Sequence, residues 1–245
     1  MNRRDLIDAL KAEDFSPYYR LADKIRFQEK GNYVDIRAIL EFSNICRRKC
    51  VYCGLNCRNQ ALHRYRMTPD EIVDTASAAA RAGYRTLVMQ SGEDPWFTPK
   101  ILGGLVKEIK KTGMAITLSC GEMPEEAYAY LRECGADRYL LKHETADPEI
   151  YSALHPDSSL QQRIACLKVL KRLGYETGSG FMIGLPVKQR KPWPTTFSCF
   201  RRLAAIWPAW DPLFPIPTRL CESFPAAAPK PPNGLWLSPA SCFPS

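Results

Sequence analysis

Short apolar runs alternate with longer amphipathic segments along most of the chain. The apolar runs are typical of strands and lie at 34–42, 86–90, 114–118, 138–141 and 175–183. The amphipathic segments are typical of helices and lie at 69–81, 99–111, 124–133 and 160–173, after two short helices within 2–30 that break near Ser16-Pro17. Thr68 and Glu71 form a capping-box pattern at the start of the helix 69–81. Apolar strands that alternate with helices predict a parallel sheet covered by helices.

Units of this kind are typical of an α/β fold of the (β/α) TIM-barrel type. Five units are recognisable, so we expect a barrel that is truncated after about five strands. In such barrels the chemistry lies at the carboxyl ends of the strands. Polar groups follow four of the predicted strands directly and predict a shared site there: 43–44, 91–94, 119–122 and 143–145.

The composition changes abruptly at Val187. The segment 187–245 holds 12 of the 20 prolines and 4 of the 5 tryptophans, but only 1 of the 14 glycines. Prolines at this density disfavour helices and central strands, yet the segment is too apolar for an ordinary disordered tail. We therefore expect N-terminal helices at 1–33, a partial barrel at 34–186 and a Pro/Trp-rich tail without a recognisable fold at 187–245.

Composition and charge narrow the class of protein. Apolar residues make up 45% and charged residues 24%, as in globular domains. No apolar run reaches the roughly 18 residues of a membrane span, and no secretory signal is visible, so we expect a cytoplasmic protein without a membrane partner. The net charge is +8, of which +5 falls in 187–245. The rest of the chain is nearly balanced, so no nucleic-acid partner is expected.

Four of the ten cysteines fall within twelve residues: Cys46, Cys50, Cys53 and Cys57. The first three form a C-x3-C-x2-C triplet directly after the first predicted strand. Three thiolates on one loop can hold three corners of a cubane iron–sulfur cluster and leave the fourth iron open. The neighbouring basic side chains would lower the thiol pKa values. A zinc site with Cys57 or His63 as the fourth ligand is the alternative.

The triplet resembles the signature of the radical S-adenosylmethionine (SAM) enzymes, in which an aromatic residue precedes the third cysteine. Tyr52 occupies that position. The resemblance implies a 4Fe–4S cluster on Cys46, Cys50 and Cys53, with SAM chelated by the open iron. It also implies reductive cleavage of SAM to methionine and a 5′-deoxyadenosyl radical.

Eight blocks in chain order resemble, more narrowly, the HydE family of FeFe-hydrogenase maturases. They are 36–44, the triplet with 54–55, 64–68, 90–95, 117–119 with 121–122, 138–141 with 143–146, 155–157 and 175–186. This resemblance implies maturation of the hydrogenase active-site cluster. The alternatives are a biotin synthase-like or methylornithine synthase-like radical enzyme, or an inactive metal-binding fragment.

The same resemblance implies contacts to SAM for seven residues: Tyr52, Ser91, Gly92, Glu93, Ser119, Glu144 and Arg163. Tyr52 would lean on the adenine, and the turn at 91–94 would meet the methionine amino group. Glu144 would bind the ribose hydroxyls or the sulfonium end, and Arg163 would pair with the methionine carboxylate. The glycine-rich stretch 180–184 would pass close to the adenine.

The resemblance further implies a cationic wall for a small anionic substrate, formed by Arg138, Lys142, His143 and Thr145. The family commonly has arginine where Lys142 stands, so bidentate recognition of an anion is weakened there. The expected partners are this small-molecule substrate, a reducing electron donor and other hydrogenase maturation proteins.

The family pattern stops after residue 186. The family continues there with Gly-Gln-Thr, whereas Val187-Lys188-Gln189 follows here. Suitable codons for 212–219, read two bases later, spell Phe-Ile-Pro-His-Pro-Asp-Thr-Pro, which resembles the family's next strand. We therefore expect a frameshift near codon 187, in the gene or in its sequencing, with a lineage-specific tail as the alternative. We also expect the chain as written to be unstable or inactive.

Overall fold

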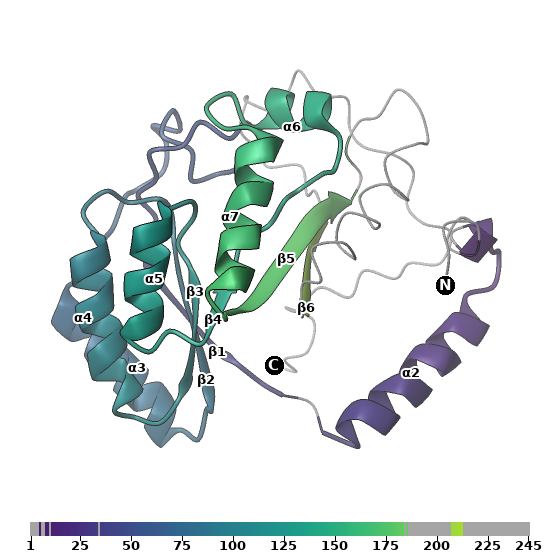
Figure 1. Cartoon of the computed structure of the whole chain (residues 1–245), viewed down its shortest axis with the longest axis horizontal. Helices are drawn as coiled ribbons and strands as arrows, with labels where there is room; N and C mark the ends of the chain where they lie inside the picture. The colour runs from purple at the N-terminus through teal and green to yellow at the C-terminus, as the bar shows by residue number, and fades with distance from the viewer. Residues whose placement is uncertain are drawn as a thin grey trace.

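A computed structural model describes residues 11–33, 35–183 and 207–212, together with residues 5, 8, 9 and 185. Its centre is a six-stranded parallel sheet in which the strands follow one another in chain order (Figure 1). The strands are β1 (Ala38–Ser43), β2 (Thr86–Ser91), β3 (Ala115–Ser119), β4 (Arg138–Leu140), β5 (Glu176–Ile183) and β6 (Trp207–Pro212). The helices are α2 (Ser16–Lys30), α3 (Pro69–Arg81), α4 (Pro99–Lys110), α5 (Glu125–Glu133), α6 (Pro148–Leu154) and α7 (Leu160–Arg172).

The core lies between the sheet and the helices α3, α4, α5 and α7, which cover one of its faces (Figure 1). Alternate strand residues supply it, because successive side chains of a strand point to opposite faces. Leu40 and Phe42 of β1 are buried in this core, whereas Ile39, directly before Leu40, is 60% exposed, and Glu41 between the two buried residues is exposed as well. The α/β prediction is confirmed, and each of the five expected strands overlaps an observed one.

Local signals set the helix ends as expected. The Thr68 side chain accepts the backbone N–H of Glu71, and the Glu71 side chain accepts the backbone N–H of Thr68, so the predicted capping box is present. The helix α2 begins at Ser16, where the sequence predicts the break. It lies apart from the helices on the sheet (Figure 1), and none of its residues is buried.

Two elements were not predicted. The helix α6 has only seven residues, too few for a clear apolar period, although Asp147 caps its start and Pro148 opens it. The strand β6 pairs in parallel with β5 inside the proline-rich segment. As the last strand of the order it is an edge strand, where proline is tolerated.

The remainder of 187–245 lies outside the described residues, as do most of the residues before Lys11. The division into 1–33, 34–186 and 187–245 therefore stays a prediction. Within the described part of the chain, no helix combines the length and the apolar character that crossing a membrane requires.

Candidate cluster and cofactor site

The cysteine triplet lies on the loop that leaves β1, and this loop is closed by its own backbone hydrogen bonds. The N–H of Cys53 donates to the carbonyl of Cys50 at 3.2 Å, and the N–H of Cys57 donates to that of Arg48 at 2.9 Å. The Arg64 guanidinium donates to four further carbonyls across 2.6–3.2 Å: those of Asn44, Leu55, Asn56 and Asn59. Arg64 thus binds backbone carbonyls at both ends of the loop. No local sequence pattern predicts this role of Arg64.

Burial, not the neighbouring cations, dominates the ionisation of the three thiols. Cys46, Cys50 and Cys53 are partly buried, whereas Cys57 is exposed. Desolvation raises the pKa of all three, that of Cys50 to about 12, and the neighbouring thiols Cys53 and Cys46 add to the rise at Cys50. The Arg48 charge does lower the pKa of Cys46, as expected, but desolvation outweighs it, so the net shift of the thiol pKa values is upward.

The three thiols nevertheless suit an iron–sulfur cluster. They are soft donors from one loop, and Cys46 Sγ accepts the backbone N–H groups of Glu93 at 3.4 Å and Arg48 at 3.5 Å. Backbone N–H groups aimed at a cysteine sulfur stabilise a thiolate and tune a cluster that it binds.

The zinc alternative finds no preformed set of ligands in the part of the chain that the structure describes. There, no three His, Cys, Asp or Glu side chains are gathered closely enough to share one metal ion. A four-iron core is larger than a single ion and takes its cysteines from farther apart.

Four charged side chains form an ion network behind the cysteine loop. The Arg48 guanidinium contacts Glu93 Oε2 and Glu122 Oε2, each at 2.7 Å, and Arg163 Nε contacts Glu122 Oε1 at 2.8 Å. These side chains are all at most 15% exposed. The network therefore joins the segments after β1, β2 and β3 to α7. Glu122 was expected at the shared site only as part of the polar group 119–122, and no individual role was predicted for it.

Glu93 is held by protein groups. Besides Arg48, its Oε2 contacts Arg47 at 3.2 Å, and its Oε1 accepts the backbone N–H of Glu122 at 3.0 Å. The turn that carries it passes directly against the cysteine loop, since a Cβ on Gly92 would lie 2.3 Å from the carbonyl oxygen of Ile45. Glycine is therefore required at 92, and the predicted contact of Glu93 with SAM stays a prediction.

Tyr52 and Glu144 meet beside the cysteines. The Tyr52 hydroxyl lies 3.3 Å from Glu144 Oε1 and 3.0 Å from His155 Nε2. Glu144 is buried and has a φ of +61°, and the N–H of Thr145 donates to the carbonyl of His143 at 2.6 Å across it. This is a strained γ-turn, and such strain in a non-glycine residue is concentrated at functional sites.

Arg163 is buried at the first turn of α7 and approaches the same place. Its Nε also donates to the hydroxyl of Tyr151 at 3.0 Å. Its charge acts on Cys50 and lowers the pKa of that thiol against the larger effect of burial. Figure 1 shows α6 and the start of α7 near the carboxyl end of β5, where the arrow of that strand ends. The structure thus brings Tyr52, Glu144 and Arg163 together with the cysteines, as the sequence predicts.

The four residues of the predicted substrate wall are spread over different surroundings. The charge of Lys142 reaches Cys53 and lowers the pKa of that thiol, although burial raises it more. Arg138 is bonded to Glu176 and, at 3.2 Å, to Thr86. His143 is fully buried with its Nδ1 2.9 Å from Ser179 Oγ, and Thr145 is buried as well.

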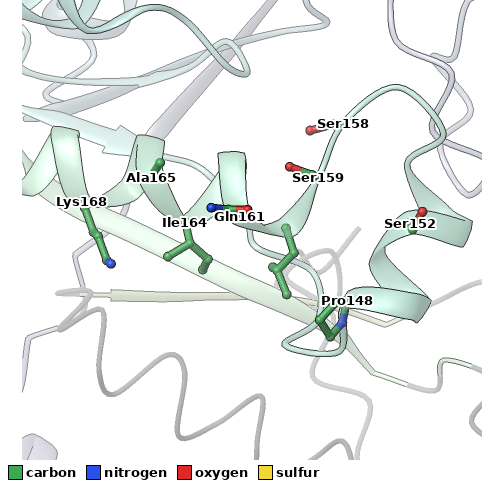
Figure 2. Close-up of a pocket in the computed structure, with 9 residues that line it drawn as sticks. Pro148, Ser152, Ser158, Ser159, Gln161, Ile164, Ala165 and Lys168 are labelled. Atoms are coloured by element: carbon green, nitrogen blue, oxygen red, sulfur yellow. The ribbon is translucent and has the colours of Figure 1, made fainter.

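The remaining predicted positions sit at strand ends. Ser91 and Ser119 are half-buried at the ends of β2 and β3. In the glycine-rich strand, the carbonyl of Gly180 accepts the N–H groups of His143 and Glu144, each at 3.0 Å. A surface pocket between α6 and α7 contains none of the predicted site residues; Ser152, Ser159, Gln161 and Lys168 are part of its lining (Figure 2).

Comparison with known proteins agrees with this site. The family model described as Radical SAM superfamily matches residues 40–198. The FeFe hydrogenase maturase subunit HydE of Thermotoga maritima is 56% identical over 168 residues, which are 69% of this chain and 48% of that protein. The 3-methylornithine synthase of Methanosarcina acetivorans is 31% identical over 185 residues, which are 74% of this chain and 53% of that protein.

A solved structure of methylornithine synthase (PylB) superposes with a TM-score of 0.85 at 28% identity. It covers 91% of this chain and 67% of its own. The chain spans about half the length of the curated relatives that it matches. Members of the matched family bind a 4Fe–4S cluster and SAM, which fits the cysteine loop described above. The chain therefore belongs to the Radical SAM superfamily.

Proposed function

We propose that this chain is a HydE-type radical SAM enzyme that serves the maturation of the active-site cluster of FeFe hydrogenases. The observation that carries the proposal is the convergence of the three triplet thiols with Tyr52, Glu144 and Arg163 at one edge of the sheet. The segment of 56% identity to a HydE protein is 168 residues long, or 69% of the chain. Within the family, this identity favours HydE over methylornithine synthase, which matches at 31%.

In this proposal Cys46, Cys50 and Cys53 hold a 4Fe–4S cluster whose fourth iron is left to SAM. When bound and reduced, the cluster supplies the electron that cleaves SAM. The side chains around it bind and orient. Tyr52 and Glu144 face the nucleoside, because a phenol packs on an aromatic base and a carboxylate accepts ribose hydroxyls.

Arg163 is proposed to pair with the methionine carboxylate. Its two described contacts use Nε, and four of the five N–H donors of a guanidinium lie on the terminal nitrogens. The network of Arg48, Glu93 and Glu122 holds the loop against the turns after β2 and β3. Ser91, Gly92 and Ser119 complete the proposed SAM contacts at the same edge.

For the substrate we propose a small anionic molecule next to Lys142, the member of the predicted wall whose charge reaches a triplet cysteine. Arg138, His143 and Thr145 remain in the proposed wall. A reducing electron donor and other hydrogenase maturation proteins are the proposed partners. Lys142→Ala should weaken substrate binding without changing the iron content, because its ammonium is a charge rather than a ligand.

Anaerobic reconstitution with iron and sulfide tests the proposal. The chain should take up four irons. After reduction with dithionite, its form with the reading frame restored from codon 187 should convert SAM to methionine and 5′-deoxyadenosine, whereas the chain as written is expected to be unstable or inactive. Cys50→Ala should abolish both results, whereas Cys57→Ala, four residues beyond the triplet, should change neither. Uptake of zinc alone, or equal effects of the two substitutions, would overturn the proposal.

A methylornithine synthase is the second candidate, because a solved enzyme of that name superposes at a TM-score of 0.85. Complementation separates the two functions. Expression in a cell that lacks its HydE gene should restore hydrogenase activity if the HydE proposal holds. Production of 3-methylornithine, without restored hydrogenase, would favour the second candidate instead.

A further inference from the structure

His155 is buried between two tyrosines and has no part in the function proposed above. Its side chain is 1% exposed. The imidazole stacks on Tyr151, with ring centroids 4.1 Å apart and planes 16° from parallel. Its other side meets Tyr52 edge-on, with centroids 5.2 Å apart. His155 also ends α6, and its backbone N–H donates to the carbonyl of Tyr151 at 2.9 Å.

The hydrogen-bond partners of this imidazole determine its tautomer. Its Nδ1 lies 3.2 Å from the backbone oxygen of Tyr151, which can only accept a hydrogen bond, so Nδ1 carries a hydrogen. A neutral imidazole has one N–H, so Nε2 is then an acceptor. The Tyr52 hydroxyl, 3.0 Å from Nε2, therefore donates to His155, and its contact to Glu144 is the longer one at 3.3 Å.

The surroundings favour the neutral imidazole. Burial lowers the pKa of His155 to about 4, and Arg163 and Arg48 lower it further, against the Tyr151 carbonyl and Asp157, which raise it. At neutral pH the ring therefore offers one donor and one acceptor in fixed directions.

The contact also joins two segments that are distant in sequence. The N–H of Val51, directly before Tyr52, donates to the carbonyl of Leu154, directly before His155, at 3.0 Å. The end of α6 is thus bonded to the cysteine loop twice, once through the backbone and once through Tyr52 and His155. On the other side, the hydroxyl of Tyr151 accepts from Arg163, so the same aromatic pair lies between two proposed SAM-binding residues.

We propose that His155, as the Nδ1–H tautomer, is a positioning residue that fixes the hydroxyl and ring of Tyr52 beside the cluster cysteines. The inference rests on the proposed function, since Tyr52 is positioned for SAM. It assigns His155 no contact with the reacting atoms. Its effect on SAM must pass through the Tyr52 hydroxyl, and this requirement makes it testable.

Nitrogen NMR of the metal-free chain tests the tautomer. The chain has only three histidines, so ¹⁵N-histidine labelling gives a spectrum that single substitutions can assign. We expect a protonated Nδ1 and an unprotonated Nε2 for His155 from pH 6 to pH 8. Tyr52→Phe should shift the Nε2 resonance, whereas Tyr65→Phe, which removes a hydroxyl bonded to the Glu41 carbonyl, should not. An Nε2–H tautomer, an imidazolium, or no shift in Tyr52→Phe would overturn the proposal.

SAM affinity of the reconstituted chain tests the consequence. His155→Ala should weaken SAM binding about tenfold, the usual contribution of one hydrogen bond, with the iron content unchanged. Tyr52→Phe should have a similar effect, and the double variant should be no weaker than either single one, because both remove the same contact. Imidazole added to His155→Ala should restore affinity, but it should not do so in the double variant. Additive losses, or rescue in the double variant, would contradict the proposal.

If His155→Ala does not fold, His155→Gln replaces it, since the amide can accept from Tyr52 and should retain most of the affinity. The two proposals fail separately. The tautomer can be as expected while the chain with its restored reading frame never cleaves SAM, which would refute the function. SAM cleavage with the opposite tautomer would refute only the positioning role.

Discussion

Replacing Arg48 by methionine should lower the free energy of unfolding by about 3 kcal/mol. The Arg48 side chain is 15% exposed and contacts the carboxylates of Glu93 and Glu122, which are 9% and 3% exposed. Removing one partner of a buried ion pair costs about 3–5 kcal/mol, because a desolvated charge is left behind. We expect the lower end of that range, since Glu93 keeps Arg47 and Glu122 keeps Arg163.

The matched control is Arg47→Met, which removes a neighbouring cation from the same loop. The Arg47 side chain is 59% exposed and lies 3.2 Å from Glu93, so its loss should cost about 0–1 kcal/mol. Urea unfolding of the metal-free chain, followed by circular dichroism, measures both variants. A loss of 3 kcal/mol moves the midpoint by about 1–3 M for a chain of ordinary urea sensitivity. Equal midpoints for the two variants would refute the claim that burial makes Arg48 contribute more to stability than Arg47.

Three further predictions concern the stability of the chain at Gly121, Glu144 and His155. Gly121→Ala should lower the free energy of unfolding, measured in urea, by more than about 2 kcal/mol, because the φ of Gly121 is +82° and the new Cβ would lie 2.1 Å from Glu93 Cγ. The control Gly113→Ala, at φ +81° with open space around it, should lower it by only about 1 kcal/mol. Glu144→Gly should be about 1 kcal/mol more stable than Glu144→Ala, because only glycine adopts its φ of +61° without strain, and equal stabilities would exclude that strain. His155 should lower the free energy of unfolding by up to about 3 kcal/mol as the pH drops from 6.5 to 4. The reason is that the imidazole of the unfolded chain takes up a proton in this range, whereas the folded one, with a pKa of about 4, does not. Urea midpoints measured across this pH range should lose this contribution to their pH dependence in His155→Gln.

The fold could be predicted where the sequence carries a periodic signal. The apolar strands such as Thr86–Ser91 and the capped helix Pro69–Arg81 have such signals, and both were located within a residue or two. The helix α6 is too short for a period, and β6 depends on pairing with β5 rather than on its own residues. Elements that tertiary contacts stabilise are therefore the ones that the sequence left out.

The site shows the same division. The cysteine spacing and Tyr52 are local and could be found in the sequence. Glu122 and His155 act through contacts with segments far away in the chain: 74 residues separate Glu122 from Arg48, and 103 separate His155 from Tyr52. Arg64 acts through backbone carbonyls, whose positions depend on the path of the loop. No spacing rule reveals partners of that kind.

The expected frameshift near codon 187 stays a prediction. Most of the residues it concerns lie outside the described part of the chain, so the coding DNA across codons 180–220 is the measurement that decides it. A second frame that is open and spells the family's next strand would support it, whereas stop codons throughout that frame would refute it.

Arg64 has a consequence for how the chain acquires iron. Its guanidinium donates to the carbonyls of Asn44, Leu55, Asn56 and Asn59, and these bonds are made between protein groups alone. The conformational entropy of arranging the loop is then lost during folding, so incoming metal does not have to order the polypeptide. The rate of cluster assembly in this chain should accordingly be limited by the delivery of iron and sulfide, and not by rearrangement of the backbone of the loop.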